Sequence, residues 1–278
     1  MKIIAKKLIS IALTLSMIWG LGATTFAVNL NNSAYTKDEL IVAEYTITIE
    51  SDTPFVSSVS YVDENGSKYL MVLDKVTHEI TLEIIADASS VYRRMDSPAG
   101  INEKYSVFIE DADPGIGEVS GVSLISSDGF VFEMPDPQYE NGKSSAVWVI
   151  PIGIALAEAL IEALLALGLA IVIGGVVWIV ITEAVAAMKS QSAYSYYLGM
   201  LRYDELLVGN GITFQAAIVE IAYNSPQYGV IATNSSYAYT LANSFSFGCY
   251  HHNPHGGSGY LPHYHSNTFS TAHCWYIT

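Results

Sequence analysis

The longest run of apolar positions in the chain lies between residues 146 and 188 and reads AVWVIPIGIALAEALIEALLALGLAIVIGGVVWIVITEAVAAM. Within it, residues 163–182 carry no charge. At the rise of an α-helix these 20 residues would span about 30 Å, the thickness of a hydrocarbon core. Ala166, Ala170 and Gly174 recur at every fourth position, as in helices that pack closely in lipid. The pattern predicts a transmembrane helix over residues 163–182.

The preceding residues, 146–157, are also uncharged, but they are too few to span a membrane and are interrupted by Pro151 and Gly153. Glu158 and Glu162 are four residues apart and share one face of a helix. Because a carboxylate inside lipid is costly, we expect both at or near a membrane interface. Two alternatives stay open: a buried helical hairpin of a soluble protein, and a segment that inserts only when it is delivered to a target membrane.

Residues 1–27 have the three parts of a secretory signal: a start with three lysines, an apolar run over residues 8–22, and small side chains near Ala27. The alternative is an uncleaved membrane anchor. We therefore expect a secreted protein or one at the cell membrane. Removal of this segment leaves nine Lys and Arg against 27 Asp and Glu, a net charge near −18. So acidic a chain does not support nucleic-acid binding through a general basic surface.

Residues 28–145 contain 21 of the 27 acidic residues and alternate between apolar and polar positions as half-buried strands do. An Asn65-Gly66 pair between two such runs is a strong hairpin signal. The segment therefore predicts an antiparallel β domain. The expected strands cover residues 41–49, 55–62, 68–73, 78–86, 107–109 and 122–132.

Residues 189–278 mix strand and helix signals in the order β-β-α-β-α, a polar histidine-rich loop, and a final strand. This order predicts a small α+β domain. The expected fold class is therefore multi-domain: an N-terminal antiparallel β domain, a hydrophobic, transmembrane-like helical segment over residues 146–188, and the C-terminal α+β domain. The expected C-terminal elements are strands 196–203, 205–208, 228–232 and 273–277 and helices 214–223 and 236–243, the helices capped by Thr213 and by Asn234 or Ser235.

Six of the seven histidines lie in this last segment. His263 and His265 are two residues apart, so in an extended chain they face the same side. If the strand that carries His273 pairs alongside, three imidazoles converge. Such a cluster has three interpretations: general acid–base catalysis of ester or phosphodiester cleavage, a zinc site with an open position, or a hydrogen-bonded structural cluster. The cofactor stays undetermined among these interpretations: zinc would be the cofactor under the second, and no motif for a small-molecule cofactor is evident.

Cys249 and Cys274 are the only two cysteines. Outside the cytosol they would be expected to form a disulfide around the histidine-rich loop. Alternatively, they would bind a metal together with the histidines. No carboxylate is near these histidines in sequence, so an acidic residue that orients them would come from Asp204, Glu205 or Glu220.

From about Glu162 to Tyr276 the chain resembles a family of secreted Gram-positive toxins with a layout like that of polymorphic toxins. The Ala/Gly-rich apolar run, the segment GNGITFQAA at residues 209–217, and the closing His-Tyr-His followed later by His and two aromatic residues carry the resemblance. The resemblance implies a toxin-like or effector C-terminal domain. It also implies functional roles for His263, His265 and His273.

The chain departs from that family pattern in its two cysteines and in the additional His251, His252 and His255. The run after His265 also lacks basic residues, which argues against a nucleic-acid substrate. The layout as a whole leads us to expect a secreted or membrane-anchored effector with a histidine-based domain. A nuclease-type hydrolase is one candidate activity for that domain, although the charge pattern does not favour a nucleic-acid substrate. A membrane and an immunity protein are the partners that this layout would have. The alternative is a non-enzymatic membrane-inserting or anchored surface protein whose histidine cluster is structural or metal-binding.

Overall fold

The computed structural model describes residues 35–36, 39–85, 102–133, 152–191, 193–202, 204–245, 247–254 and 260–278. Of these residues 48% lie in strands, which form two large sheets, and four short helices accompany them. The chain divides into two compact units. The N-terminal unit contains the described residues up to 74 and from 79 to 175, and the C-terminal unit contains 75–78 and those from 176 on. The predicted signal, residues 1–27, lies outside the described residues.

The N-terminal unit contains a nine-stranded antiparallel sheet, as the alternating pattern predicts. Its spatial order is β1-β2-β3-β4-β5-β6-β7-β10-β11. The predicted turn at Asn65-Gly66 connects β4 to β5, and Gly66 has a φ of 81°, which glycine adopts without strain. The strands are β1 (Tyr35–Thr36), β2 (Glu39–Val42), β3 (Tyr45–Asp52), β4 (Val56–Val62), β5 (Lys68–Asp74), β6 (Glu79–Ile85), β7 (Asn102–Phe108), β10 (Ser123–Ser126) and β11 (Val131–Glu133).

The predicted transmembrane helix is wrong. The apolar run instead forms α2 (Ile154–Leu167), β12 (Ala170–Ile173), β13 (Val176–Val180) and α3 (Ile181–Gln191). No helix in the described ranges is long and apolar enough to cross a membrane. The alternative of a buried helical hairpin is also wrong, because two strands separate the helices. The fold class is accordingly mostly β and not a β domain joined by a membrane helix to a small α+β domain.

The physical reason lies in two glycines and the residues around them. Gly174 and Gly175 have φ values of 56° and 77° and form the turn between β12 and β13. Positive φ at two successive residues ends any α-helix, and the β-branched residues on either side favour strands. Leu169, which follows the helix, also has a positive φ of 47°.

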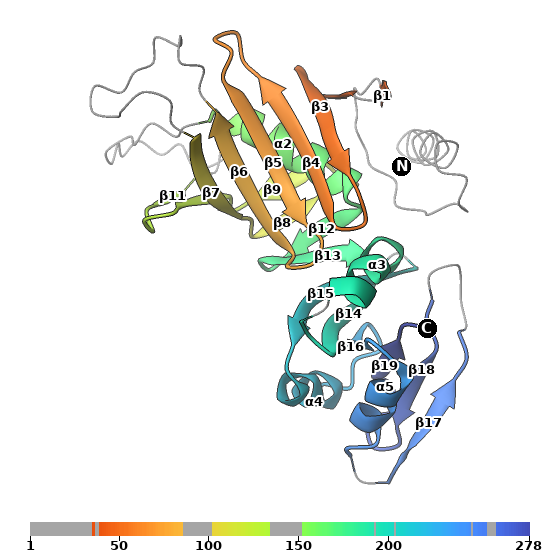
Figure 1. Cartoon of the computed structure of the whole chain (residues 1–278). Helices are drawn as coiled ribbons and strands as arrows, with labels where there is room; N and C mark the ends of the chain where they lie inside the picture. The colour runs from red at the N-terminus through yellow and green to blue at the C-terminus, as the bar shows by residue number, and fades with distance from the viewer. Residues whose placement is uncertain are drawn as a thin grey trace. The chain divides into compact units, whose positions relative to one another are not determined.

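Helix α2 is apolar on most of its surface because strands cover it on more than one side. It packs against β2–β5 of the nine-stranded sheet (Figure 1) and against the short strands β8 (Asp111–Asp113), β9 (Glu118–Ser120) and β12. A helix that is apolar all round is either buried or in a membrane, and the sequence alone does not separate the two cases. Burial raises the pKa of the half-buried Glu158 and Glu162, and in Glu162 the neighbouring Glu158 carboxylate adds to the rise.

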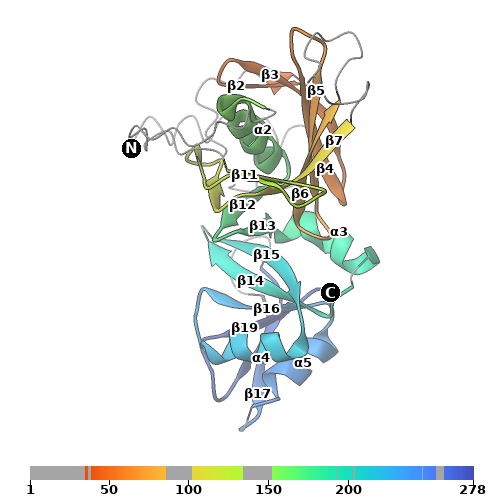
Figure 2. The same ribbon diagram turned by 90° about the vertical axis from the view of Figure 1, so that its left-hand side faces the viewer.

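The C-terminal unit contains seven strands in the order β17-β18-β19-β16-β14-β15-β13. Strands β16 and β19 are parallel, and the other strand pairs described for this unit are antiparallel. Figure 2 shows α4 and α5 together on one side of this sheet. The further elements are β14 (Tyr196–Arg202), β15 (Glu205–Ile212), α4 (Phe214–Ala222), β16 (Tyr228–Ala232), α5 (Ser235–Ala242), β17 (Cys249–His252), β18 (His263–Ser266) and β19 (His273–Tyr276).

Both predicted helix caps are present. The side chain of Thr213 accepts a hydrogen bond from the Ala216 amide at the start of α4, and that of Asn234 accepts one from the Tyr237 amide at the start of α5. The expected strand 205–208 is longer than predicted, because β15 continues through Asn210 to Ile212 and Gly211 pairs with Tyr197.

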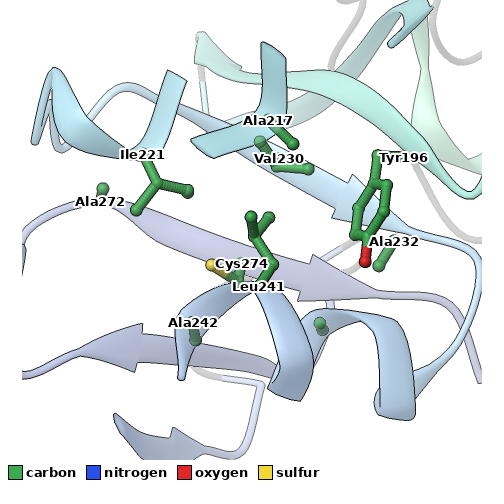
Figure 3. Packing of buried hydrophobic residues seen from close by; sticks show 10 residues of the cluster. Tyr196, Ala217, Ile221, Val230, Ala232, Leu241, Ala242, Ala272 and Cys274 are labelled. Carbon is green, nitrogen blue, oxygen red and sulfur yellow. The ribbon is translucent and has the colours of Figure 1, made fainter. Parts of the chain in front are cut away.

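A cluster of buried side chains joins α4 and α5 to one face of the sheet (Figure 3). Ile221 and Leu241 come from the helices, while Tyr196, Val230 and Cys274 come from β14, β16 and β19. Burial of such apolar side chains stabilises the domain by about 25 cal/mol per Å² removed from water. Cys274 of β19 and Tyr264 of β18 pack on this helix-covered face. Neighbours along a strand point to opposite sides, so His263, His265 and His273 lie on the other face of the sheet.

Candidate metal centre

Three adjacent strands, β17, β18 and β19, carry the histidine cluster. Paired residues of an antiparallel ladder point to the same side, and neighbours along a strand point to opposite sides. The pairs His252–His263 and Tyr250–His265 in β17 and β18 therefore share a face with each other. His263 also pairs with Trp275 of β19, so His273, two residues before it, faces the same side.

The imidazole rings on this face are in contact with one another. Ring centroids are 4.9 Å apart for His263 and His265, 5.0 Å for His263 and His273, and 4.7 Å for His265 and His273. The convergence expected for these three histidines is therefore present. His252 joins them, at 5.5 Å from His263 and 5.0 Å from His265.

The three histidines best placed for a metal are His252, His263 and His265. Each can offer one ring nitrogen such that the three atoms all lie within 4.8 Å of one another. In a tetrahedral zinc site, bonds of about 2.0–2.1 Å place such nitrogens about 3.3 Å apart, so a small inward closure of the rings completes the geometry. His263 and His265 are buried, and His252 is half-buried on the edge strand β17.

Hydrogen bonds fix the tautomers of the two buried rings. Nδ1 of His263 lies 3.1 Å from the carbonyl oxygen of Leu261, and Nδ1 of His265 lies 2.9 Å from that of Ala272. A carbonyl oxygen only accepts, so each Nδ1 donates and carries the hydrogen. The lone pair is then on Nε2, which is the arrangement of metal-binding histidines whose other nitrogen donates to a backbone carbonyl.

His252 is the member of the cluster that sequence reasoning missed, because β17 was expected to be part of a loop. The spacing held a usable signal, since Tyr250 and His252 are two residues apart just as His263 and His265 are. His251 points to the opposite face, where its Nε2 lies 2.9 Å from the hydroxyl of Tyr276. His255 lies outside the described residues.

Cys249 and Cys274 are free thiols, so the expected disulfide is not present. They lie on β17 and β19 with β18 between them. Two strand spacings alone separate them by about 9.6 Å, whereas a disulfide requires Cα atoms within about 7 Å. Cys274 belongs to the buried cluster under α4 and α5, opposite the histidines. Burial raises the pKa of both thiols, and Cys249 further raises that of Cys274, so both stay protonated at neutral pH.

The three carboxylates expected as orienting groups lie on different elements of the C-terminal unit. Glu220 belongs to α4, on the other side of the sheet, and burial raises its pKa. Asp204 and Glu205 lie near Tyr260. Burial is the main cause that raises the pKa of the Tyr260 phenol, and the charges of these two carboxylates raise it further. The groups that face Nδ1 of His263 and of His265 are the backbone carbonyls of Leu261 and Ala272.

No protein-family model, no curated protein and no solved structure matches this chain. What the site can do therefore follows from its own chemistry. Neutral imidazole nitrogens that converge on one point suit zinc, copper and nickel, and they are poor ligands for magnesium or calcium, which prefer oxygen.

Proposed function

We propose that the C-terminal unit binds a divalent transition metal, in the first place Zn²⁺, through His252, His263 and His265. The observation that carries the proposal is the set of three ring nitrogens within 4.8 Å of one another. The carbonyl bonds of His263 and His265 support it, because they leave Nε2 of each ring without a hydrogen before a metal arrives. Metal binding then costs no tautomer change at two of the three ligands.

The experiment is a metal titration of the full-length chain lacking residues 1–27. We expect one Zn²⁺ per chain by elemental analysis, and a rise in the melting temperature that EDTA reverses, because a ligand that binds only the folded state stabilises it. Loss of a residue that only hydrogen-bonds to a metal ligand typically weakens metal binding by about 10–100-fold. His265→Ala removes a ligand itself, so it should weaken zinc binding by at least as much.

The matched control is His251→Ala. His251 precedes a proposed ligand in the chain, but its ring lies on the opposite face and contacts Tyr276. This variant should bind Zn²⁺ as the unsubstituted protein does. Equal loss in His251→Ala and His265→Ala, or stoichiometric zinc in His265→Ala, would contradict the proposal.

A second candidate function is that of a secreted effector with a hydrolytic C-terminal unit. The resemblance of residues 162–276 to Gram-positive toxins supports it, and so does the metal site, because a metal with three protein ligands can activate water for hydrolysis. The pattern of residues 1–27 supports export. The competing possibility is a non-enzymatic surface protein that binds metal without catalysis.

Expression of the chain without residues 1–27 in a bacterial cytosol separates these candidates. An effector hydrolase should arrest growth, and His252→Ala should relieve the arrest while His251→Ala does not. Residues 75–78 belong to the C-terminal unit, so a fragment that starts after them would lack part of it and the whole chain is the proper material. Zinc binding without growth arrest favours the non-enzymatic surface protein.

A further inference from the structure

We infer that a metal held by His252, His263 and His265 keeps one coordination position open to a small exogenous ligand, and that His273 stands beside the metal without binding it. This inference rests on the proposed metal binding and adds the coordination of the site. Three protein ligands with an open position characterise metal sites that take up further ligands, whereas four protein ligands characterise closed structural sites.

The distances between rings do not by themselves exclude a four-histidine site. The ring of His273 is as close to His263 and His265 as these two are to each other. The nitrogen positions make the first distinction. Among the described residues, only His252, His263 and His265 bring their ligand atoms mutually within 4.8 Å, and His273 is not a member of that set.

The stacking of His273 on Trp275 makes the second distinction. The rings of His252, His263 and His265 are inclined to one another by 60°, 70° and 80°, so their nitrogen-bearing edges can point toward a common centre. The ring of His273 is inclined to those of His263 and His265 by a similar 65° and 57°, but it also lies flat on the indole of Trp275, with ring centroids 4.7 Å apart and planes only 3° from parallel. Tilting the His273 ring out of this plane to reach a metal would break the stack.

The backbone of the sheet holds the indole in place and therefore holds the stack. Trp275 is only 1% exposed. A Cβ atom at Gly199 of β14 or at Gly229 of β16 would lie 2.9 Å from the indole, closer than carbon atoms approach in proteins. Glycine at both positions thus makes room for Trp275, and His273 is fixed as a wall of the site.

The remaining side of the site lies at the edge of the sheet. His252 belongs to the edge strand β17 and is half-buried, so this ligand borders on solvent. Tyr250, in the same strand, stacks on His265 with centroids 5.2 Å apart and planes inclined by 21°, and it is 37% exposed. An exogenous ligand that enters past β17 must be small, because these rings line its path.

The test uses Co²⁺ in place of Zn²⁺, because Co²⁺ reports its coordination through visible absorption, and azide as the exogenous ligand. The full chain without residues 1–27 is loaded with one equivalent of Co²⁺ and titrated with azide. We expect a saturable change in the Co²⁺ spectrum. His273→Phe, which keeps an aromatic ring on Trp275 but has no nitrogen, should bind Co²⁺ within about twofold of the unsubstituted protein and respond to azide equally.

The outcomes separate this inference from the proposal on which it rests. Co²⁺ uptake that His265→Ala abolishes, with no azide response, would overturn the open position alone. An azide response that appears only in His273→Phe would show that His273 is the fourth ligand. Failure to bind Co²⁺ would overturn the metal site and the open position together. Circular dichroism of each variant checks that the fold is intact.

Discussion

Nδ1 of His265 lies 2.9 Å from the backbone carbonyl oxygen of Ala272, seven residues farther along the chain. Ala272 directly precedes β19, so the segment that brings His273 to the cluster also sets the tautomer of His265. The bond needs no side chain from Ala272. It is a property of how the chain returns from β18 to β19.

We predict that the Nδ1-protonated tautomer is present in both His263 and His265 before any metal is added. The reason is that each Nδ1 faces a carbonyl oxygen, which accepts but cannot donate. Two-dimensional ¹⁵N–¹H spectra of the metal-free protein distinguish the tautomers through the shifts of the two ring nitrogens. Zinc should then change chiefly the Nε2 resonances. A protonated Nε2 in either ring of the metal-free protein at neutral pH would contradict this prediction.

A second prediction concerns the glycines beneath Trp275. A Cβ at Gly199 would lie 2.9 Å from the buried indole, and overpacking of this kind costs about 1–3 kcal/mol of unfolding free energy. Gly229→Ala should cost more than Gly199→Ala, because its Cβ would also lie 2.3 Å from the carbonyl oxygen of His273, and backbone yields less than a side chain. Urea unfolding followed by tryptophan fluorescence measures both.

The control for these variants is Gly153→Ala. Nothing lies within 4 Å of a Cβ at Gly153, and its φ of −62° is open to alanine. We expect a smaller loss there than at either glycine under Trp275. A loss at Gly199 no larger than at Gly153 would mean that the indole is not held against β14.

A third prediction tests the turn inside the apolar run. Gly174→Ala should destabilise the protein by about 1–2 kcal/mol, because Gly174 has a positive φ and a residue with a Cβ is strained by about that much in the left-handed region. Gly175→Ala should cost more, since its Cβ would also lie 2.8 Å from the ring of Phe108. Gly174→Asn should cost least, because asparagine tolerates positive φ.

The same substitutions would behave differently in a continuous helix. There Gly174→Ala would raise stability by up to about 1 kcal/mol, because alanine is the better helix former. The sign of the change in unfolding free energy therefore distinguishes a turn at Gly174 from the helix that the hydropathy pattern predicts. Stabilisation by Gly174→Ala would contradict the turn.

The parts of the fold that could be predicted are those that local chemistry determines. The Asn65-Gly66 turn and the Thr213 cap act within a few residues, and both are present. The common facing of His263 and His265 also follows from the two-residue period of a strand. Their contact with His273 needed one assumption about long-range pairing, and the pairing of β18 with β19 supplies it.

The parts that could not be predicted depend on long-range packing. Residues 163–182 are apolar because strands enclose α2 and because β12 and β13 are themselves buried, and hydropathy does not distinguish this burial from lipid. Strands β17 and β18 are rich in histidine and tyrosine and lack apolar alternation, so only their pairing reveals them. His252 was missed as a ligand for the same reason.

The final prediction is a pH dependence of stability in the N-terminal unit. Burial raises the pKa of Glu162 above its ordinary value of 4.5, and the Glu158 carboxylate one helical turn away raises it further. The folded state thus holds its proton to higher pH than the unfolded chain does. This stabilisation is fully present below about pH 4.5 and is lost as pH rises through the folded-state pKa. Above the folded-state pKa, the half-buried charge of Glu162 costs stability.

Glu162→Gln removes that charge without changing the shape of the side chain, so it should stabilise the protein at pH 7. The advantage should shrink as the pH falls toward 4.5, because the native glutamate then becomes neutral as well. Glu158→Gln should act in the same direction, since burial also raises the pKa of Glu158. Urea unfolding at several pH values measures the difference. The contradicting result is a Glu162→Gln variant that is less stable than the native protein at pH 7 and equally stable at low pH. It would show that the Glu162 charge stabilises the folded state.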